Sequence, residues 1–166
     1  MSIILGIDPG SRITGYGLIQ VEKTQVSYVA SGCIRIPTDD LPLRLLTIYQ
    51  NIGELISQYA PHQAAIEQVF VGKSVSSALK LGHARGAAIL AIAEAGLPLG
   101  EYAPRTIKQA VAGTGAADKE QVQAMVVRLL DLNRTPSADA ADALACLLYT
   151  SPSPRDLSTC RMPSSA

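Results

Sequence analysis

Short hydrophobic runs separated by polar turns predict three strands in the first third of the chain. Residues 3–7 are mostly apolar and β-prone without a break, as in a strand buried on both faces. Residues 13–21 are rich in β-branched and aromatic types, and a polar turn at 22–24 separates them from a third such segment, 26–35. We expect these three strands to be joined by hairpins.

A helical periodicity replaces this pattern from residue 41 onward. Residues 41–59 place apolar side chains on one stripe and predict an amphipathic helix. The later segments alternate, with strands expected at 64–67 and 97–102 and helices at 75–95, 104–112, 118–130 and 137–148. Antiparallel strands followed by alternating strands and helices predict an α/β fold, a mixed five-stranded sheet flanked by helices on both faces.

Small residues and one proline add detail to this fold. Gly15 and Gly17 share one face of a strand, which indicates either close approach of another backbone or ligand, or a bulge or tight hairpin. Gly82 and Gly86, four residues apart on the helix 75–95, favour core packing over a subunit interface. Pro98 cannot donate to a ladder, so the last strand is expected at or near a sheet edge.

Length and composition indicate one domain. The chain has 166 residues, 48% of them hydrophobic, which is enough for a substantial core, and we assign residues 1–148 to it. At residue 149 the composition changes to Ser and Pro, so we expect residues 149–166 to be disordered. This segment interrupts a helical pattern, and we hypothesise that it is not native to the fold.

Several classes of protein are disfavoured by composition. No run of about 18 apolar residues predicts a membrane span. No secretory signal pattern is present and the three cysteines lack motif spacing, which predicts free thiols in the cytoplasm. The formal net charge of zero argues against a protein that coats nucleic acid generally, although a local basic groove is compatible with it.

Four acidic residues stand out by their position. Asp8 ends the first strand before a Pro-Gly turn, and Glu67 ends the fourth strand. Asp139 and Asp142 lie three apart among alanines, hence on one face of a helix. Alone, each has an ordinary explanation, such as a turn cap, a lysine partner or stabilisation of a helix dipole. Together they predict a site, because like charges on an apolar surface repel each other unless a cation binds them.

The types of these residues indicate the chemistry. Ligation by oxygen alone, without His or Cys clusters, selects Mg²⁺ or Mn²⁺, and several carboxylates suggest two ions. Two ions about 4 Å apart suit phosphoryl transfer, which predicts a phosphodiester substrate. Residues 68–134 contain five acids and eight bases, a modest excess that a solvated surface would also explain; the bases are Lys73, Lys80, Arg85, Arg105, Lys108, Lys119, Arg128 and Arg134. Phe70, the only phenylalanine, could stack on bases or anchor its loop.

The sequence resembles the RuvC family of Holliday-junction resolvases. The matching segments cover essentially residues 1–146 in family order; they are 6–12, 31–35, 65–70, 78–82 and 138–143. The resemblance implies a ribonuclease-H-like fold, a homodimer and an Mg²⁺-dependent endonuclease that cuts four-way DNA junctions in recombination and repair. It also implies partnership with the RuvA–RuvB branch-migration complex. Family members continue the last helix and often end in a basic segment, which the segment from residue 149 replaces here.

The resemblance also assigns roles to residues. It makes Asp8, Glu67, Asp139 and Asp142 the catalytic metal ligands. Phe70 matches an aromatic residue that engages bases near the crossover, and Lys108 and Lys119 match basic residues needed for cleavage. The candidate DNA contacts are therefore Phe70, Lys73, Lys80, Arg85, Lys108 and Lys119.

Three alternatives remain open at this point. The hairpin at residues 6–11 resembles the phosphate-binding hairpin of actin-like and sugar-kinase ATPases, which need two such lobes. A YqgF-type nuclease of RNA processing would share the fold, although the Phe70 loop and the 138–143 helix favour a resolvase. A non-catalytic junction-binding module is the third alternative, and the four acids argue against it.

Overall fold

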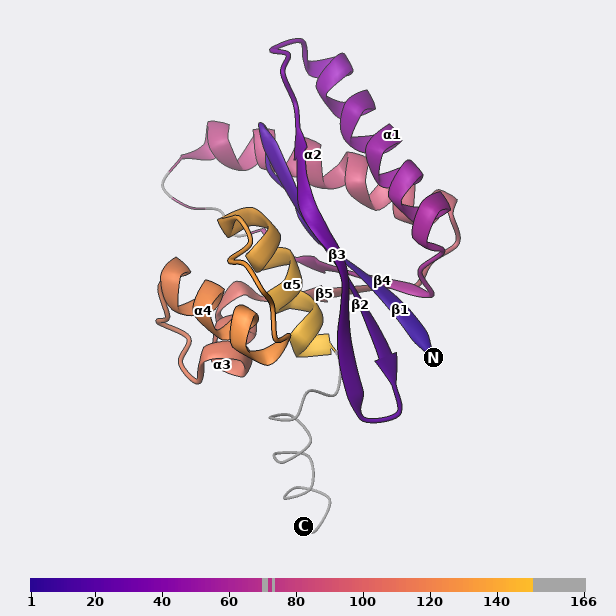
Figure 1. Ribbon diagram of the computed structural model, residues 1–166. Helices are drawn as coiled ribbons and strands as arrows, with labels where there is room; N and C mark the ends of the chain where they lie inside the picture. The colour runs from indigo at the N-terminus through magenta and orange to yellow at the C-terminus, as the bar shows by residue number, and fades with distance from the viewer. Residues whose placement is uncertain (70–71, 73, 151–166) are drawn as a thin grey trace.

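The computed structural model describes residues 1–69, 72 and 74–150, which form a sheet between two layers of helices (Figure 1). The five strands are β1 (Ser2–Asp8), β2 (Ile13–Glu22), β3 (Gln25–Arg35), β4 (Gln63–Glu67) and β5 (Leu99–Tyr102). Their order is β3-β2-β1-β4-β5, with β1, β2 and β3 antiparallel and with β4 and β5 parallel to β1. The mixed five-stranded sheet and the edge position of the last strand are confirmed.

The helices cover both faces of the sheet, as the sequence predicted (Figure 1). The five helices are α1 (Leu41–Tyr59), α2 (Val75–Glu94), α3 (Pro104–Ala112), α4 (Lys119–Leu129) and α5 (Ala138–Thr150). One core lies between the sheet and α1 and α2, and a second core lies between the sheet and α3, α4 and α5. No helix in the described ranges is both long enough and apolar enough to cross a membrane.

Element boundaries differ from the expected ones by at most two residues, and the largest consequence is at the end of α5. The Ser/Pro-rich segment was expected to be disordered from residue 149, but α5 continues to Thr150. The first helix-breaking residue in this segment is Pro152, and a proline disfavours helix only from the residue before it. The rest of that expectation, for residues 151–166, lies outside the described residues.

The glycines of β1 and β2 bring α5 close to the sheet. A Cβ atom added to Gly17 would lie 2.6 Å from Cδ2 of Leu144, and one added to Gly6 would lie 2.5 Å from the carbonyl oxygen of Ala143. A Cβ on Gly15 would collide with the backbone of Asp139. Close approach of α5 is therefore the correct interpretation of both glycines, since the Asp139 backbone meets Gly15 and mainly the Leu144 side chain meets Gly17. The irregularity in the pairing of β2 with β3 lies elsewhere, between Leu18 and Ile19.

The core-packing interpretation of Gly82 and Gly86 is wrong. Both glycines are exposed, and a Cβ added to either would have no neighbour within 4 Å. The core face of α2 is instead formed by Ala84, Ala87, Ala88, Ala91 and Ile92. Because α2 carries small residues on both sides, residue size alone did not identify its buried face.

Candidate active site

Asp8 and Glu67 meet at the carboxyl ends of β1 and β4. These strands are parallel neighbours in which Ile7 pairs with Ile66, so the two acids follow paired positions. Successive strand residues face opposite sides of a sheet, and Ile4 and Ala65 belong to the core beneath α3, α4 and α5. Asp8 and Glu67 therefore face that layer too. Their carboxyl groups share a hydrogen bond.

The first turns of α5 bring the other two acids to the same place. The backbone N–H of Ala140 donates to the Ser137 hydroxyl, at 3.3 Å, and the N–H of Ala141 donates to the Ser137 carbonyl, at 2.8 Å. This start places the Asp139 backbone against Gly15, the residue that pairs with Asp8 across β1 and β2. Asp142 follows one turn later on the same face of the helix.

The electrostatics show that the four carboxylates form one cluster. Burial first, and then the charges of Asp142, Glu67 and Asp139, together raise the pKa of Asp8 from 3.8 to about 8. Burial, followed by the charge of Asp142, raises the pKa of Glu67. Burial also raises the pKa of Asp142, with a smaller contribution from Asp139. The site therefore holds excess negative charge that a cation would neutralise.

The donor set fits a hard divalent cation. Carboxylate oxygens are the ligands that Mg²⁺ and Mn²⁺ prefer. In the side-chain positions seen in the described part of the chain, no three His, Cys, Asp or Glu residues converge tightly enough to hold one ion. A cation would take the place of the proton in the hydrogen bond between Asp8 and Glu67, because carboxylates bind metal in their deprotonated form.

We expect the metal-free protein to lose stability as the pH rises from about 4 to about 8. A carboxyl group with a higher pKa in the folded chain than in the unfolded chain favours the folded state at low pH, and this advantage is lost as the pH rises through the interval. The interval for Asp8 is 3.8 to about 8, and Glu67 and Asp142 shift in the same direction.

Thermal unfolding in EDTA between pH 5 and pH 8 measures this effect. We expect the midpoint to fall by on the order of 5 °C and Mg²⁺ to raise it more at pH 8 than at pH 5. A midpoint that does not change with pH, with or without Mg²⁺, would contradict mutual repulsion among the acids.

Two lysines lie near the cluster. The charges of Lys108, on α3, and Lys119, the first residue of α4, both lower the pKa of Glu67 and of Asp142, although burial outweighs them. Lys108 is half-buried and Lys119 is exposed. The structure thus brings together six of the residues that sequence analysis selected: the four acids and these two lysines.

The remaining candidates lie elsewhere or outside the described residues. Lys80 is exposed on α2 and lines a small pocket with Ser11 and Arg44, and no described contact joins it to the acids. Arg85 contacts its own chain: Nε donates to the Glu67 carbonyl at 3.3 Å, and Nη2 pairs with Glu101 at 2.8 Å. Phe70 and Lys73 lie outside the described residues.

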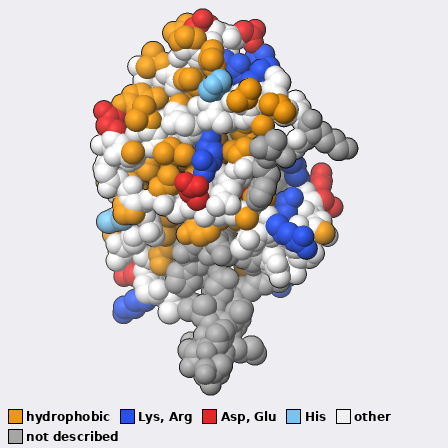
Figure 2. Space-filling view, turned by 180° about the vertical axis from the view of Figure 1, so that it is seen from behind, with side chains coloured by type: hydrophobic (Ala, Val, Ile, Leu, Met, Phe, Trp, Pro, Cys, Tyr) orange, Lys and Arg blue, Asp and Glu red, His pale blue; other side chains and the backbone are white. Residues whose placement is uncertain are grey.

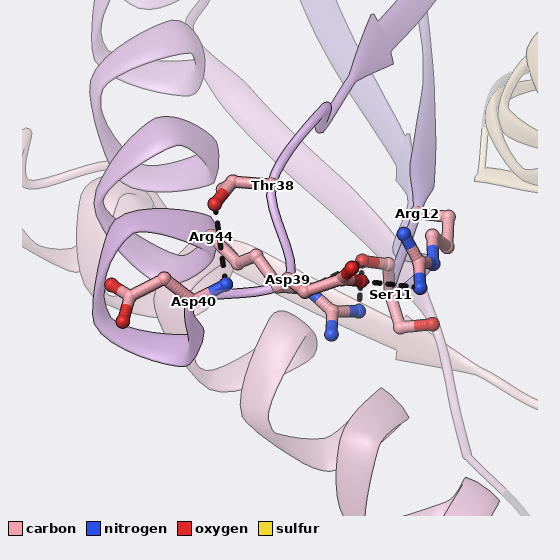
Figure 3. Close-up of polar contacts among 6 residues, drawn as sticks. All are labelled: Ser11, Arg12, Thr38, Asp39, Asp40 and Arg44. Carbon is pink, nitrogen blue, oxygen red and sulfur yellow. Dashed lines mark hydrogen bonds and ion pairs between the residues drawn. The ribbon is translucent and has the colours of Figure 1, made fainter.

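Sequence analysis missed Arg44. This residue is buried on α1, and its guanidinium donates to the Ser11 carbonyl in the turn that follows Asp8 (Figure 3). A signal was present, because Arg44 lies three residues after Leu41 and four before Ile48, on the apolar stripe of the helix. A cation in such a stripe needs a specific partner, which the sequence alone does not identify.

Comparison with known proteins identifies the family. A family model described as crossover junction endodeoxyribonuclease RuvC matches residues 4–149. The crossover junction endodeoxyribonuclease RuvC of Histophilus somni (strain 129Pt) is 61% identical over 145 residues, 87% of this chain and 77% of that protein. This chain belongs to the RuvC family.

RuvC from Thermus thermophilus has a similar structure, with a TM-score of 0.79 and 34% identity, over 89% of this chain and 92% of that one. A T. thermophilus RuvC structure in complex with Holliday junction substrate gives a TM-score of 0.82 at 33% identity, over 90% and 92%.

Membership of the RuvC family establishes the class of activity. The protein is an endonuclease that hydrolyses DNA, and its family depends on divalent metal. The mixed sheet with helices on both faces is the ribonuclease-H-like α/β fold that the resemblance implied. The ATPase and YqgF-type alternatives are other families, and the match over residues 4–149 decides against both.

Proposed function

We propose that this protein resolves four-way (Holliday) DNA junctions by paired symmetric nicks during homologous recombination and DNA repair. The observation that carries the proposal is the cluster of Asp8, Glu67, Asp139 and Asp142 at the carboxyl ends of β1 and β4, in a chain of the RuvC family. The related T. thermophilus RuvC in complex with Holliday junction substrate supports the choice of DNA. Bacterial relatives support a cytoplasmic location.

The four acids would hold two Mg²⁺ ions, for which Mn²⁺ could substitute. Bound there, the ions would activate a water and stabilise the departing 3′ oxygen, leaving a 5′-phosphate and a 3′-hydroxyl. The chain itself supplies the burial and charge that make the carboxylates avid for cations. Lys108 and Lys119 would face the scissile phosphate, since their charges already act on Glu67 and Asp142.

The other candidate DNA contacts differ in the partners that they already have within the chain. Lys80 is free to bind a phosphate because it is exposed and has no ion pair within the described residues. Arg85 already has partners in its own chain, so its guanidinium would support Glu67 as well as any phosphate. For Phe70 and Lys73 the support is the resemblance alone, and the same is true of the RuvA–RuvB partnership. Residues 1–148 would suffice for the nuclease domain.

We propose that the protein is a homodimer whose subunits meet at the groove between α1 and α2. This groove is lined by Pro42, Leu45, Leu46, Tyr49, His83, Gly86, Ala87 and Leu90. Leu90 is 61% exposed, and Figure 2 shows hydrophobic side chains gathered on this face of the molecule. Gly82 and Gly86 leave room for a second helix to approach closely. Two equivalent subunits would suit a substrate with approximate two-fold symmetry.

The proposed activity is tested with a labelled synthetic four-way junction and a matched linear duplex, each with Mg²⁺ and with EDTA. We expect paired nicks in the junction, dependent on Mg²⁺, and no cleavage of the duplex. Junction binding without cleavage would mean that the protein is a non-catalytic junction-binding module. Absence of both activities from a folded protein would overturn the proposal and direct attention to RNA substrates.

The proposed interface is tested with Leu90→Asp, which puts a charge into the apolar groove. We expect the mass measured by light scattering to fall from that of a dimer to that of a monomer. Leu43→Asp is the matched control, because Leu43 is an exposed leucine of α1 outside the groove lining, and it should leave the dimer intact. A Leu90→Asp protein that remains dimeric would place the interface elsewhere.

A further inference from the structure

The turn after Asp8 is fixed by contacts at each residue from Gly10 to Arg12. The Gly10 N–H donates to the Thr14 hydroxyl, which in turn donates to the Gly10 carbonyl, both at 3.3 Å. The Ile36 N–H donates to the Arg12 carbonyl at 3.0 Å. Arg44 supplies the partner of the remaining carbonyl, that of Ser11. A turn held in this way cannot shift one residue without breaking several hydrogen bonds.

Arg44 is the unusual member of this set because it is a buried cation. Its exposed fraction is 9%, and Nε lies 3.2 Å from the Ser11 carbonyl oxygen, to which Nη2 also donates. No carboxylate forms an ion pair with it among the described residues. Asp40 caps α1 through the Leu43 N–H, and its carboxylate points away from the guanidinium in Figure 3.

Burying the charge of Arg44 disfavours folding, so its presence implies a role that an apolar residue could not perform. Removing a cation from water without a counter-ion disfavours folding, and the surrounding Leu41, Leu45 and Ile48 show that apolar packing is available here. The guanidinium also spans the gap between α1 and the turn, placing two donors on one carbonyl oxygen. The effect of these two hydrogen bonds is therefore to fix the position of Ser11, three residues after Asp8.

The second catalytic strand is held in the same manner. Arg85, on α2, donates from Nε to the carbonyl of Glu67 itself and is oriented by its ion pair with Glu101 on β5. Thus the ends of β1 and β4, which carry the two acids that share a hydrogen bond, are each bound by an arginine from the α1–α2 layer. The acids themselves face the opposite layer.

We propose that Arg44 is a positioning residue, which fixes the turn at Ser11 and so sets Asp8 for metal binding and cleavage. This inference rests on the proposed function, since it assigns Asp8 to the metal site. Reacting groups must be placed within about 0.5 Å, and a misplacement of about 1 Å costs on the order of 100-fold in rate. Loss of the Arg44 contact should therefore reduce turnover while leaving the DNA-binding surface unaltered.

The test uses Arg44→Met in the full chain, because methionine keeps much of the apolar stem and removes the donors. We expect kcat on a four-way junction to fall about 10- to 100-fold, with junction affinity in EDTA unchanged within about twofold. Calorimetric titration with Mn²⁺, without DNA, should show metal binding weakened by about tenfold. In metal-free protein, amide hydrogen exchange should accelerate at residues 10–12 and stay unchanged in α4.

The matched control is Asp39→Asn, which breaks the exposed ion pair between Arg12 and Asp39 on the outside of the same turn (Figure 3). It should leave turnover and Mn²⁺ affinity at the wild-type level, because exposed pairs contribute little. If Arg44→Met does not fold, Arg44→Lys replaces it, since an ammonium keeps the charge but cannot place two donors as a guanidinium does; we expect it to lower turnover by about threefold to tenfold.

The outcomes separate this inference from the proposed function. Wild-type turnover and Mn²⁺ affinity in a folded Arg44 variant would overturn the positioning role while junction cleavage by the wild type still stands. Failure of the wild type to cut the junction would overturn the proposed function itself. Weaker Mn²⁺ binding by Arg44→Met in that case would still support the coupling between Arg44 and the acidic cluster.

Discussion

Asp8→Asn should bind four-way junctions and fail to cut them. We expect cleavage to fall by at least about 1,000-fold, because Asp8 is the member of the cluster whose pKa responds to all three other acids and asparagine removes its charge without changing its shape. Junction affinity in EDTA should stay within about twofold of wild type. Cleavage of a labelled junction with Mg²⁺ and gel-shift titration in EDTA measure the two quantities.

The same substitution should stabilise the metal-free protein at pH 8. It removes one of the charges that repel each other in the folded state, so the midpoint of thermal unfolding in EDTA should rise, and its dependence on pH should become weaker. Asp131→Asn, a change at an exposed acid outside the cluster, should alter neither cleavage nor stability. Normal cleavage by the Asp8→Asn protein would remove Asp8 from the mechanism.

The sequence predicted the order of elements well because the deciding signals are local. Hairpin-linked strands and apolar stripes are read over ten to twenty residues, and the placement of β1 beside β4 follows from connection rules. The residues that pack against a glycine are distant along the chain, so the local sequence does not identify them. Gly15 and Gly17 therefore stayed ambiguous, and Gly82 and Gly86 were assigned to the wrong environment, since alanines at 84, 88 and 91 fit the core equally well.

In the candidate site too, residues marked by local patterns could be predicted, whereas residues with partners distant along the chain could not. Asp8 and Glu67 could be predicted to converge because both end strands that are neighbours in the expected sheet. Arg44 and Arg85 could not be interpreted from the sequence, since their partners are backbone carbonyls distant along the chain. Counting the bases of residues 68–134 made Arg85 a possible phosphate contact, whereas its guanidinium binds its own fold.

Gly15→Ala should disable the enzyme through packing rather than chemistry. The added methyl group would collide with the Asp139 backbone and lie 2.9 Å from its Cβ, so the start of α5 must move away from the sheet. Overpacking of this kind costs about 1–3 kcal/mol, which corresponds to roughly 2–12 °C in the unfolding midpoint. Displacing Asp139 should lower cleavage by on the order of 100-fold. Thermal unfolding and junction cleavage measure both effects.

Two further glycine variants separate displacement of Asp139 from overpacking in general. Gly53→Ala lies inside α1 where an added Cβ has no neighbour within 4 Å, so it should raise stability slightly through helix propensity and leave cleavage unchanged. Gly17→Ala would meet mainly the Leu144 side chain, which can rotate, 2.6 Å away at Cδ2. It should therefore destabilise the fold while costing far less activity than Gly15→Ala. Equal loss of activity in the Gly15 and Gly17 variants would mean that the whole of α5, rather than the placement of Asp139, limits cleavage.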